Sequence, residues 1–175
     1  NLWTLKVDLE NAFNTIDREA VPEAVKESFP ELEAWYRFCY EAQANLFCEG
    51  KVLPFGSSRG VQQGDPLGPL LFALGLLRTC RTLKEKLKAD TLSAWYLDDG
   101  TVVGDIDEIL AAWQIIQEEV AKVGLKVNTG KCELIPPEGW QGELPEELKD
   151  VPRGNAAGFE LLGAPIGSKE FCEEY

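Results

Sequence analysis

Residues 94–104 constrain the fold of this 175-residue chain more than any other stretch. They have the pattern of an apolar strand, a turn and a second apolar strand, with the adjacent carboxylates Asp98 and Asp99 at the tip. An Asp-Gly pair is a strong indication of a two-residue hairpin loop, so Asp99 and Gly100 are predicted to form the turn. Turn chemistry alone explains an Asp and a Gly at this place. A functional role for the two carboxylates therefore depends on the rest of the chain.

The pattern directly after this hairpin predicts an amphipathic helix over residues 106–123. Asp105, followed three residues later by Glu108, has the form of a capping box, and Gly124 is a typical helix terminator. The apolar residues recur at helical spacing: Ile106, Ile109, Leu110, Trp113, Ile116, Val120 and Val123. A second long helix is predicted over residues 67–88, where leucines repeat at the same spacing.

Shorter elements are predicted before and after these two helices. An opening strand over residues 2–7 is followed by a helix that Asp17 caps and that ends before Pro30. The spacing of apolar residues predicts a further helix over residues 31–44, with its aromatic side chains in the core. Short strands or extended pieces are predicted at 45–48, 51–55, 125–127, 132–135, 159–163 and 164–167. Residues 136–155 are rich in Pro, Gly and Glu and are expected to form a surface insertion.

The order of these elements predicts an α+β fold, with helices packed on one face of a mostly antiparallel sheet. No repeat or interdomain linker interrupts residues 1–175, and a chain of this length with 45% hydrophobic residues can bury a sizeable core. A single domain is therefore expected. No apolar run approaches the length of a membrane span and no leader peptide is visible, so we expect an intracellular location, cytoplasmic or nuclear, and no membrane partner.

The chain contains no His, and its five cysteines are scattered without close partners. Zinc sites, His-based acid-base catalysis and Cys-His nucleophile pairs are thereby disfavoured, and carboxylates remain for metal chemistry. Asp8 ends the first predicted strand and would meet Asp98 and Asp99 if the two strands are neighbours. Three carboxylates at one place repel one another unless divalent cations neutralise them, and two Mg²⁺ ions suit phosphoryl transfer. The residues therefore indicate Mg²⁺-dependent phosphate chemistry.

The charge of the chain limits what it binds by itself. Its net charge of −13 argues against this segment alone holding a nucleic-acid backbone by counterion release. If the chain acts on nucleic acid, we expect the basic surface to lie elsewhere.

Several blocks of the sequence follow one another in a recognisable order. Residues 59–74 contain a Gln-Gly-x-Pro-Leu-x-Pro core, residues 96–99 read Tyr-Leu-Asp-Asp, and in residues 6–13 an aspartate precedes an aromatic by five positions. Together with residues 124–131 and residues 161–167, these blocks resemble the five conserved blocks of reverse transcriptases, most closely the non-LTR retrotransposon type. The resemblance covers about residues 2–167 of the chain, and the block at 59–74 is its most specific part.

The resemblance implies a polymerase palm, which transfers deoxynucleotides from dNTPs to a DNA primer on an RNA template with two Mg²⁺ ions, or Mn²⁺ in their place. It implies that Asp8, Asp98 and Asp99 are catalytic and hold the metal ions together with the backbone carbonyl of Leu9. It also implies a set of nucleotide-binding residues: Phe13, Gln63, Gly64, Tyr96 and Lys131. In this family the bulky ring of Phe13 would clash with a 2′-hydroxyl and favour deoxynucleotides. A core phenylalanine and an exposed turn lysine are the alternatives for Phe13 and Lys131.

The same resemblance leaves other functions open. The chain begins at the first block and ends just beyond the fifth block at residues 161–167, which resembles the primer grip of the family. The fingers, the thumb and any endonuclease or RNase H segment are therefore expected to lie outside it. An incomplete or domesticated remnant of a retroelement, acting as a structural or binding module, is therefore the alternative to a working polymerase. An RNA-directed RNA polymerase palm is a third possibility, against which Phe13 and the Tyr-Leu-Asp-Asp block argue. Asn14 departs from the pattern, since many relatives carry Asp there.

Overall fold

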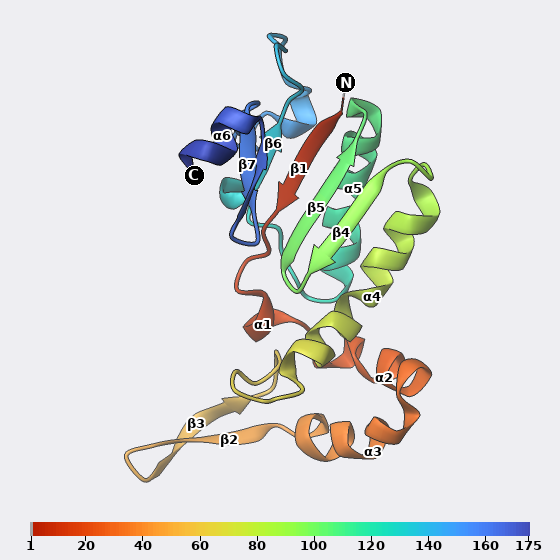
Figure 1. Cartoon of the computed structure of the whole chain (residues 1–175). Coiled ribbons are helices and arrows are strands. Elements are labelled where there is room, and N and C mark those ends of the chain that lie inside the picture. The colour runs from red at the N-terminus through yellow and green to blue at the C-terminus, as the bar shows by residue number, and fades with distance from the viewer. Residues whose placement is uncertain (1) are drawn as a thin grey trace.

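A four-stranded antiparallel sheet forms the centre of the computed structural model, which describes residues 2–175 (Figure 1). The strands lie in the order β4-β5-β1-β6. Their bounds are Trp3–Val7 for β1, Leu92–Tyr96 for β4, Asp99–Gly104 for β5 and Glu133–Ile135 for β6. The first strand of the chain is therefore central, and strands from later parts of the chain pair with both of its edges.

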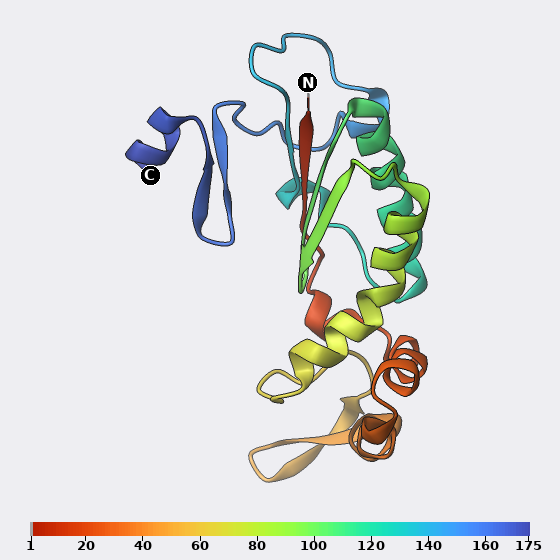
Figure 2. The same ribbon diagram turned by 45° about the vertical axis from the view of Figure 1, so that its right-hand side comes forward.

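Two long helices cover one face of this sheet, and a separate hairpin lies on the side of the other face (Figure 2). The helices are α4 (Gly68–Lys86) and α5 (Ile106–Lys122), and the hairpin strands are β7 (Gly158–Leu161) and β8 (Ala164–Gly167). Side chains alternate along β1, so that Leu5 and Val7 are buried in the core while Lys6 faces the other side. The predicted α+β architecture, with helices packed on one face of an antiparallel sheet, is confirmed.

The helix α5 confirms the N-cap at Asp105 but not the reciprocal bond of the capping box predicted from the sequence. The carboxylate of Asp105 accepts a hydrogen bond from the backbone N–H of Glu108 at 3.0 Å, and Gly124 follows the helix with a φ of +74°. The Glu108 carboxylate does not turn back to Asp105 but accepts the backbone N–H of Lys88 at 2.8 Å. This bond ties the start of α5 to the segment that follows α4.

The elements between β1 and α4 lie beyond the end of the sheet at which β1 ends (Figure 1). They are α1 (Ala12–Thr15), α2 (Pro22–Ser28), α3 (Glu33–Tyr36), β2 (Ala44–Cys48) and β3 (Lys51–Ser57). The strands β2 and β3 pair with each other in a two-stranded sheet of their own. The hairpin predicted around residues 45–55 is confirmed.

Two predictions in this region are wrong. The continuous helix expected over residues 31–44 is broken into a 3-10 turn, α3 and a wider π-helical turn that ends at Glu41. This geometry stacks the buried rings of Tyr36 and Tyr40 with their centroids 5.5 Å apart. Asp17 precedes a 3-10 turn, but its side chain makes no capping bond, and its carboxylate pairs with Arg59 at 3.5 Å instead.

The last third of the chain adds β6 to the sheet and then forms elements that lie outside it. The extended piece predicted at 125–127 is reduced to one isolated bridge, between Leu9 and Val127, whereas the hairpin of β7 and β8 is confirmed. The insertion at 136–155 remains a prediction, although Leu148 within it is fully buried. A short helix, α6 (Lys169–Glu174), closes the chain. Within residues 2–175, none of the helices has the length and apolarity needed to cross a membrane.

Candidate active site

The turn between β4 and β5 differs from the prediction. Tyr96 pairs with Asp99, so Leu97 and Asp98 form the two-residue turn and Asp99 already belongs to β5. Leu97 has a φ of +57°, in the left-handed region that two-residue hairpin loops require but that leucine seldom adopts. The prediction that Asp99 and Gly100 form the turn is therefore wrong.

Gly100 serves close packing between strands instead. It pairs with Val7 on one side and with Trp95 on the other. A Cβ atom at this position would lie 2.7 Å from the indole ring of Trp95. The glycine that favoured a turn in the sequence is thus required by the aromatic ring on the neighbouring strand.

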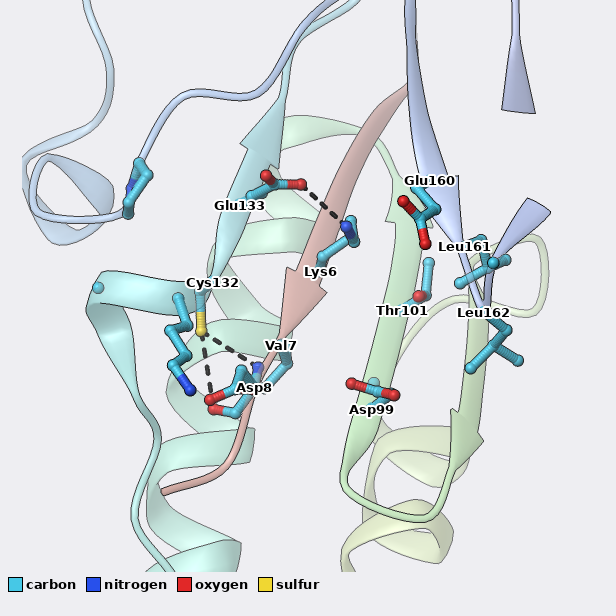
Figure 3. Close-up of a pocket in the computed structure, with 15 residues that line it drawn as sticks. Lys6, Val7, Asp8, Asp99, Thr101, Cys132, Glu133, Glu160, Leu161 and Leu162 are labelled. Carbon is cyan, nitrogen blue, oxygen red and sulfur yellow. Dashed lines mark hydrogen bonds and ion pairs between the residues drawn. The ribbon is translucent and has the colours of Figure 1, made fainter. Parts of the chain in front are cut away.

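This register brings Asp8 opposite Asp99. The pair Val7 and Gly100 ends the ladder between β1 and β5, and one further step along each strand reaches the two aspartates. Both side chains line a cavity of about 730 Å³ that lies between the open face of the sheet and the turn of the β7–β8 hairpin (Figure 3). The other residues along its wall include Lys6, Thr101, Lys131, Glu133, Glu160 and Leu162.

The two carboxylates lack compensating partners. Within residues 2–175 neither Asp8 nor Asp99 forms a side-chain hydrogen bond or an ion pair, and the nearby Lys6 is engaged by Glu133 at 3.0 Å. Partial burial raises the pKa of Asp99, and the charges of Asp98 and Asp8 raise it further. This local excess of negative charge is the condition that a bound cation would relieve.

The donor set fits a magnesium ion that takes some of its ligands from the protein and the others from water and a substrate. Mg²⁺ takes oxygen ligands and commonly binds through one or two carboxylates, with water and substrate phosphates completing its shell. In the part of the chain that the structure describes, no three His, Cys, Asp or Glu side chains gather closely enough to enclose a metal ion. Asp98 belongs to the turn and does not line the cavity that Asp8 and Asp99 share. A site built from this chain alone would therefore remain open.

A second cavity holds three of the residues expected to bind a nucleotide. Phe13, Gln63 and Gly64 line this cavity, which has a volume of about 470 Å³. The Phe13 ring is half-buried and stacks on that of Phe72, with 4.6 Å between centroids and 9° between ring planes. Gly64 has a φ of +92°, which favours glycine over other residues.

The other expected residues are divided between the two places. Lys131 lines the larger cavity together with Asp8 and Asp99, and its side chain is exposed. Tyr96 is 61% exposed and lies opposite Asp99, outside both cavities. Leu9 is buried and precedes α1, so any ligand from it would come from its backbone.

Sequence reasoning missed two residues that support Asp8. The buried sulfur of Cys132 accepts the backbone N–H of Asp8 at 3.4 Å (Figure 3). The backbone N–H of Asn128 donates to the carbonyl of Asp8 at 2.9 Å. Nothing local in the sequence indicates either contact. Lys6 could have been found, because it lies two positions before Asp8 and therefore on the same face of the strand.

Comparison with known proteins identifies relatives along most of the chain. A family model described as reverse transcriptase (RNA-dependent DNA polymerase) matches residues 1–166. The chain is 32% identical over 141 residues to the retrotransposable element SLACS 132 kDa protein of Trypanosoma brucei gambiense, covering 78% of this chain and 12% of that protein. It is 34% identical over 125 residues to the Pol polyprotein from the type-2 retrotransposable element R2DM of Drosophila melanogaster, covering 66% and 10%. The chain thus spans about a tenth of the length of these curated relatives.

Solved structures support the fold. Apo telomerase from Candida tropicalis superposes with a TM-score of 0.68 at 14% identity, over 95% of this chain and 31% of that one. Telomerase from Candida albicans, in complex with a fragment of telomeric RNA, gives a TM-score of 0.67 at 13% identity, over 98% and 30%. At these identities the likeness concerns the arrangement of helices and strands.

Proposed function

Since the chain belongs to the reverse transcriptase (RNA-dependent DNA polymerase) family, we propose that it forms the palm of an RNA-directed DNA polymerase, which adds deoxynucleotides to a primer 3′-hydroxyl. One observation carries the proposal. Asp8 directly follows β1 and Asp99 begins the adjacent strand β5, beside the turn that contains Asp98. The two carboxylates line one cavity without hydrogen-bonding or ionic partners among residues 2–175.

The family generally uses divalent metal ions, and the donor set of this chain suits them. We assign Asp8, Asp98, Asp99 and the backbone carbonyl of Leu9 as the ligands of two Mg²⁺ ions, for which Mn²⁺ could substitute. When bound, such ions neutralise charge on the attacking and leaving oxygens of a phosphoryl transfer. The protein's own part is to hold these oxygen donors at the end of a rigid sheet.

The second cavity would receive the incoming deoxynucleotide. Phe13 is braced by its stack on Phe72, so its ring is fixed where it could exclude a 2′-hydroxyl. Gln63 and Gly64 line the same cavity. In this proposal Tyr96 contacts the primer end, and the exposed Lys131 offers a positive charge near the leaving pyrophosphate.

The RNA template and DNA primer would be bound mainly by the longer protein. With a net charge of −13, this segment repels a phosphate backbone over much of its surface. In this proposal the segment carries out the chemistry of the palm, and other parts of the polypeptide hold the duplex. We also propose an intracellular setting. The alternative is a module that keeps this fold without performing synthesis.

Primer extension on an RNA template tests the proposal with the full-length protein that carries this segment. We expect Mg²⁺-dependent extension, reduced about 100-fold or more by Asp98→Asn or Asp99→Asn, because each change removes a negative oxygen ligand. The control is Asp90→Asn, which removes an exposed carboxylate with no ion pair within residues 2–175. Full activity of the Asp98 and Asp99 variants, or no extension by the unaltered protein, would exclude the polymerase and favour the alternative.

A further inference from the structure

Residues 62–64, which we call the 62–64 wall, stand at the rim of the smaller cavity with exposed side chains. A tyrosine that is distant in sequence contacts the backbone of this wall through its hydroxyl group. Tyr40 is 2% exposed, and its hydroxyl accepts the backbone N–H of Gln62 at 3.2 Å. The same hydroxyl donates to a carboxylate oxygen of Asp65 at 2.5 Å. One phenol group therefore joins Gln62, the first residue of the wall, to Asp65, the residue directly after it.

Asp65 extends this connection to the start of α4. Its second carboxylate oxygen accepts the backbone N–H of Leu67 at 2.9 Å. Its backbone N–H donates to the carbonyl of Gln62 at 3.2 Å, and its own carbonyl accepts the N–H of Gly68 at 2.9 Å. Asp65 thus closes the turn that contains the wall and fixes that turn to the helix behind it.

The position of the Tyr40 hydroxyl is itself fixed. The ring stacks on Tyr36 with 7° between ring planes, and the Arg18 guanidinium lies 5.2 Å from its centroid. Arg18 is 8% exposed and donates to the backbone carbonyls of the segment leading to the wall, at Ser57, Arg59 and Gly60. Burial, followed by the bond to Asp65, raises the pKa of Tyr40 to about 12, so the phenol keeps its proton at neutral pH and remains a donor.

We propose that Tyr40 is a positioning residue for nucleotide binding, which acts through Gln62 and Asp65 to hold the 62–64 wall of the cavity that Phe13 also lines. The inference builds on the proposed function, because it assigns the smaller cavity to the nucleotide. A phenylalanine would fill the same space and keep both aromatic contacts. The hydroxyl adds two hydrogen bonds, one with Gln62 and one with Asp65, and both of these residues line that cavity.

The test compares Tyr40→Phe with Tyr36→Phe in the full-length protein. Each change removes one buried hydroxyl from the same stacked pair of rings, but that of Tyr36 donates to the carbonyl of Arg18 at 2.6 Å, away from the wall. We expect Tyr40→Phe to raise the Kd of a fluorescent deoxynucleoside triphosphate and the KM for dNTP about tenfold, with kcat changed less than about twofold. Tyr36→Phe should lower the melting temperature and leave both constants unchanged.

Hydrogen exchange on the 175-residue chain gives a readout that needs no activity. The amide of Gln62 should exchange faster in Tyr40→Phe than in the unaltered chain or in Tyr36→Phe, because it loses its acceptor. Equal nucleotide constants in Tyr40→Phe and the unaltered protein, or the same increase in Tyr36→Phe, would overturn the positioning role while leaving the polymerase in place. Failure of the unaltered protein to bind the nucleotide would overturn both.

Discussion

The carboxylate of Asp99 lies near two other negative charges, those of Asp98 and Asp8. Burial, Asp98 and Asp8 raise its pKa, and Lys6 partly opposes them. Because the pKa is higher in the folded than in the unfolded chain, the stability linked to this group is fully present below the unfolded value of about 3.9 and is lost as the pH rises through the folded value. At neutral pH the ionised carboxylate therefore lowers the free energy of unfolding of the metal-free chain.

We predict that Asp99→Asn raises the melting temperature of the metal-free chain at pH 7 by about 1 °C. The gain is small because the side chain is exposed in part, which screens the repulsion to a few tenths of a kcal/mol. Differential scanning calorimetry in EDTA would measure it, and the gain should vanish at pH 3, where the carboxyl group is protonated. Asp90→Asn, the matched exposed change, should have no effect, and a lower melting temperature for Asp99→Asn at pH 7 would contradict this reading.

At the scale of single residues, the sequence predicted the meeting of Asp8 and Asp99 better than the turn beside them. Asp8 follows an apolar strand and Asp99 belongs to a hairpin, and both patterns are local. The turn was misplaced by two residues because the Asp-Gly motif is ambiguous: Gly100 is needed where the Trp95 ring approaches from the next strand. No local sequence pattern indicates such a contact between neighbouring strands.

The elements follow their sequence patterns wherever burial is regular. The segment at 106–123 has an unbroken apolar stripe and a capping pair, and α5 forms there as predicted. The segment at 31–44 was predicted as one helix, but it widens and stops early. Its course depends on the packing of Tyr36 and Tyr40 against each other and of Tyr40 against Arg18, which are tertiary contacts.

The β4–β5 hairpin depends on the absence of a side chain at position 100. We predict that Gly100→Ala destabilises the chain by about 1–3 kcal/mol, which lowers its melting temperature by several degrees, because the added methyl group overlaps the Trp95 ring. Gly130→Ala is the control, since the nearest atom to its Cβ would be an Asn128 oxygen at 3.9 Å. Thermal unfolding of both variants decides the matter. Equal stability of Gly100→Ala and the control would show that the ring moves aside freely.

At the scale of the whole molecule, the site exists only because the sheet places β1 between β5 and β6. Periodicity in the sequence predicts strands and helices but carries no information on their order in a sheet. The resemblance of the five blocks supplied the expectation of a polymerase palm, and the family match and the solved structures agree with that fold. The support that Cys132 and Tyr40 give to the two cavities comes from segments distant in sequence, and this explains why sequence patterns did not reveal it.

The fold therefore brings together carboxylates from distant parts of the chain, and we propose a cation site at this place. The direct test of this site is a titration of the chain with Mn²⁺, in which binding is measured as the loss of the electron paramagnetic resonance signal of free Mn²⁺. We predict that the unaltered chain and Asp90→Asn bind Mn²⁺ alike, that Mg²⁺ competes for the site, and that Asp8→Asn and Asp99→Asn each weaken binding about tenfold or more. Equal Mn²⁺ binding by all four proteins, or none by the unaltered chain, would contradict it.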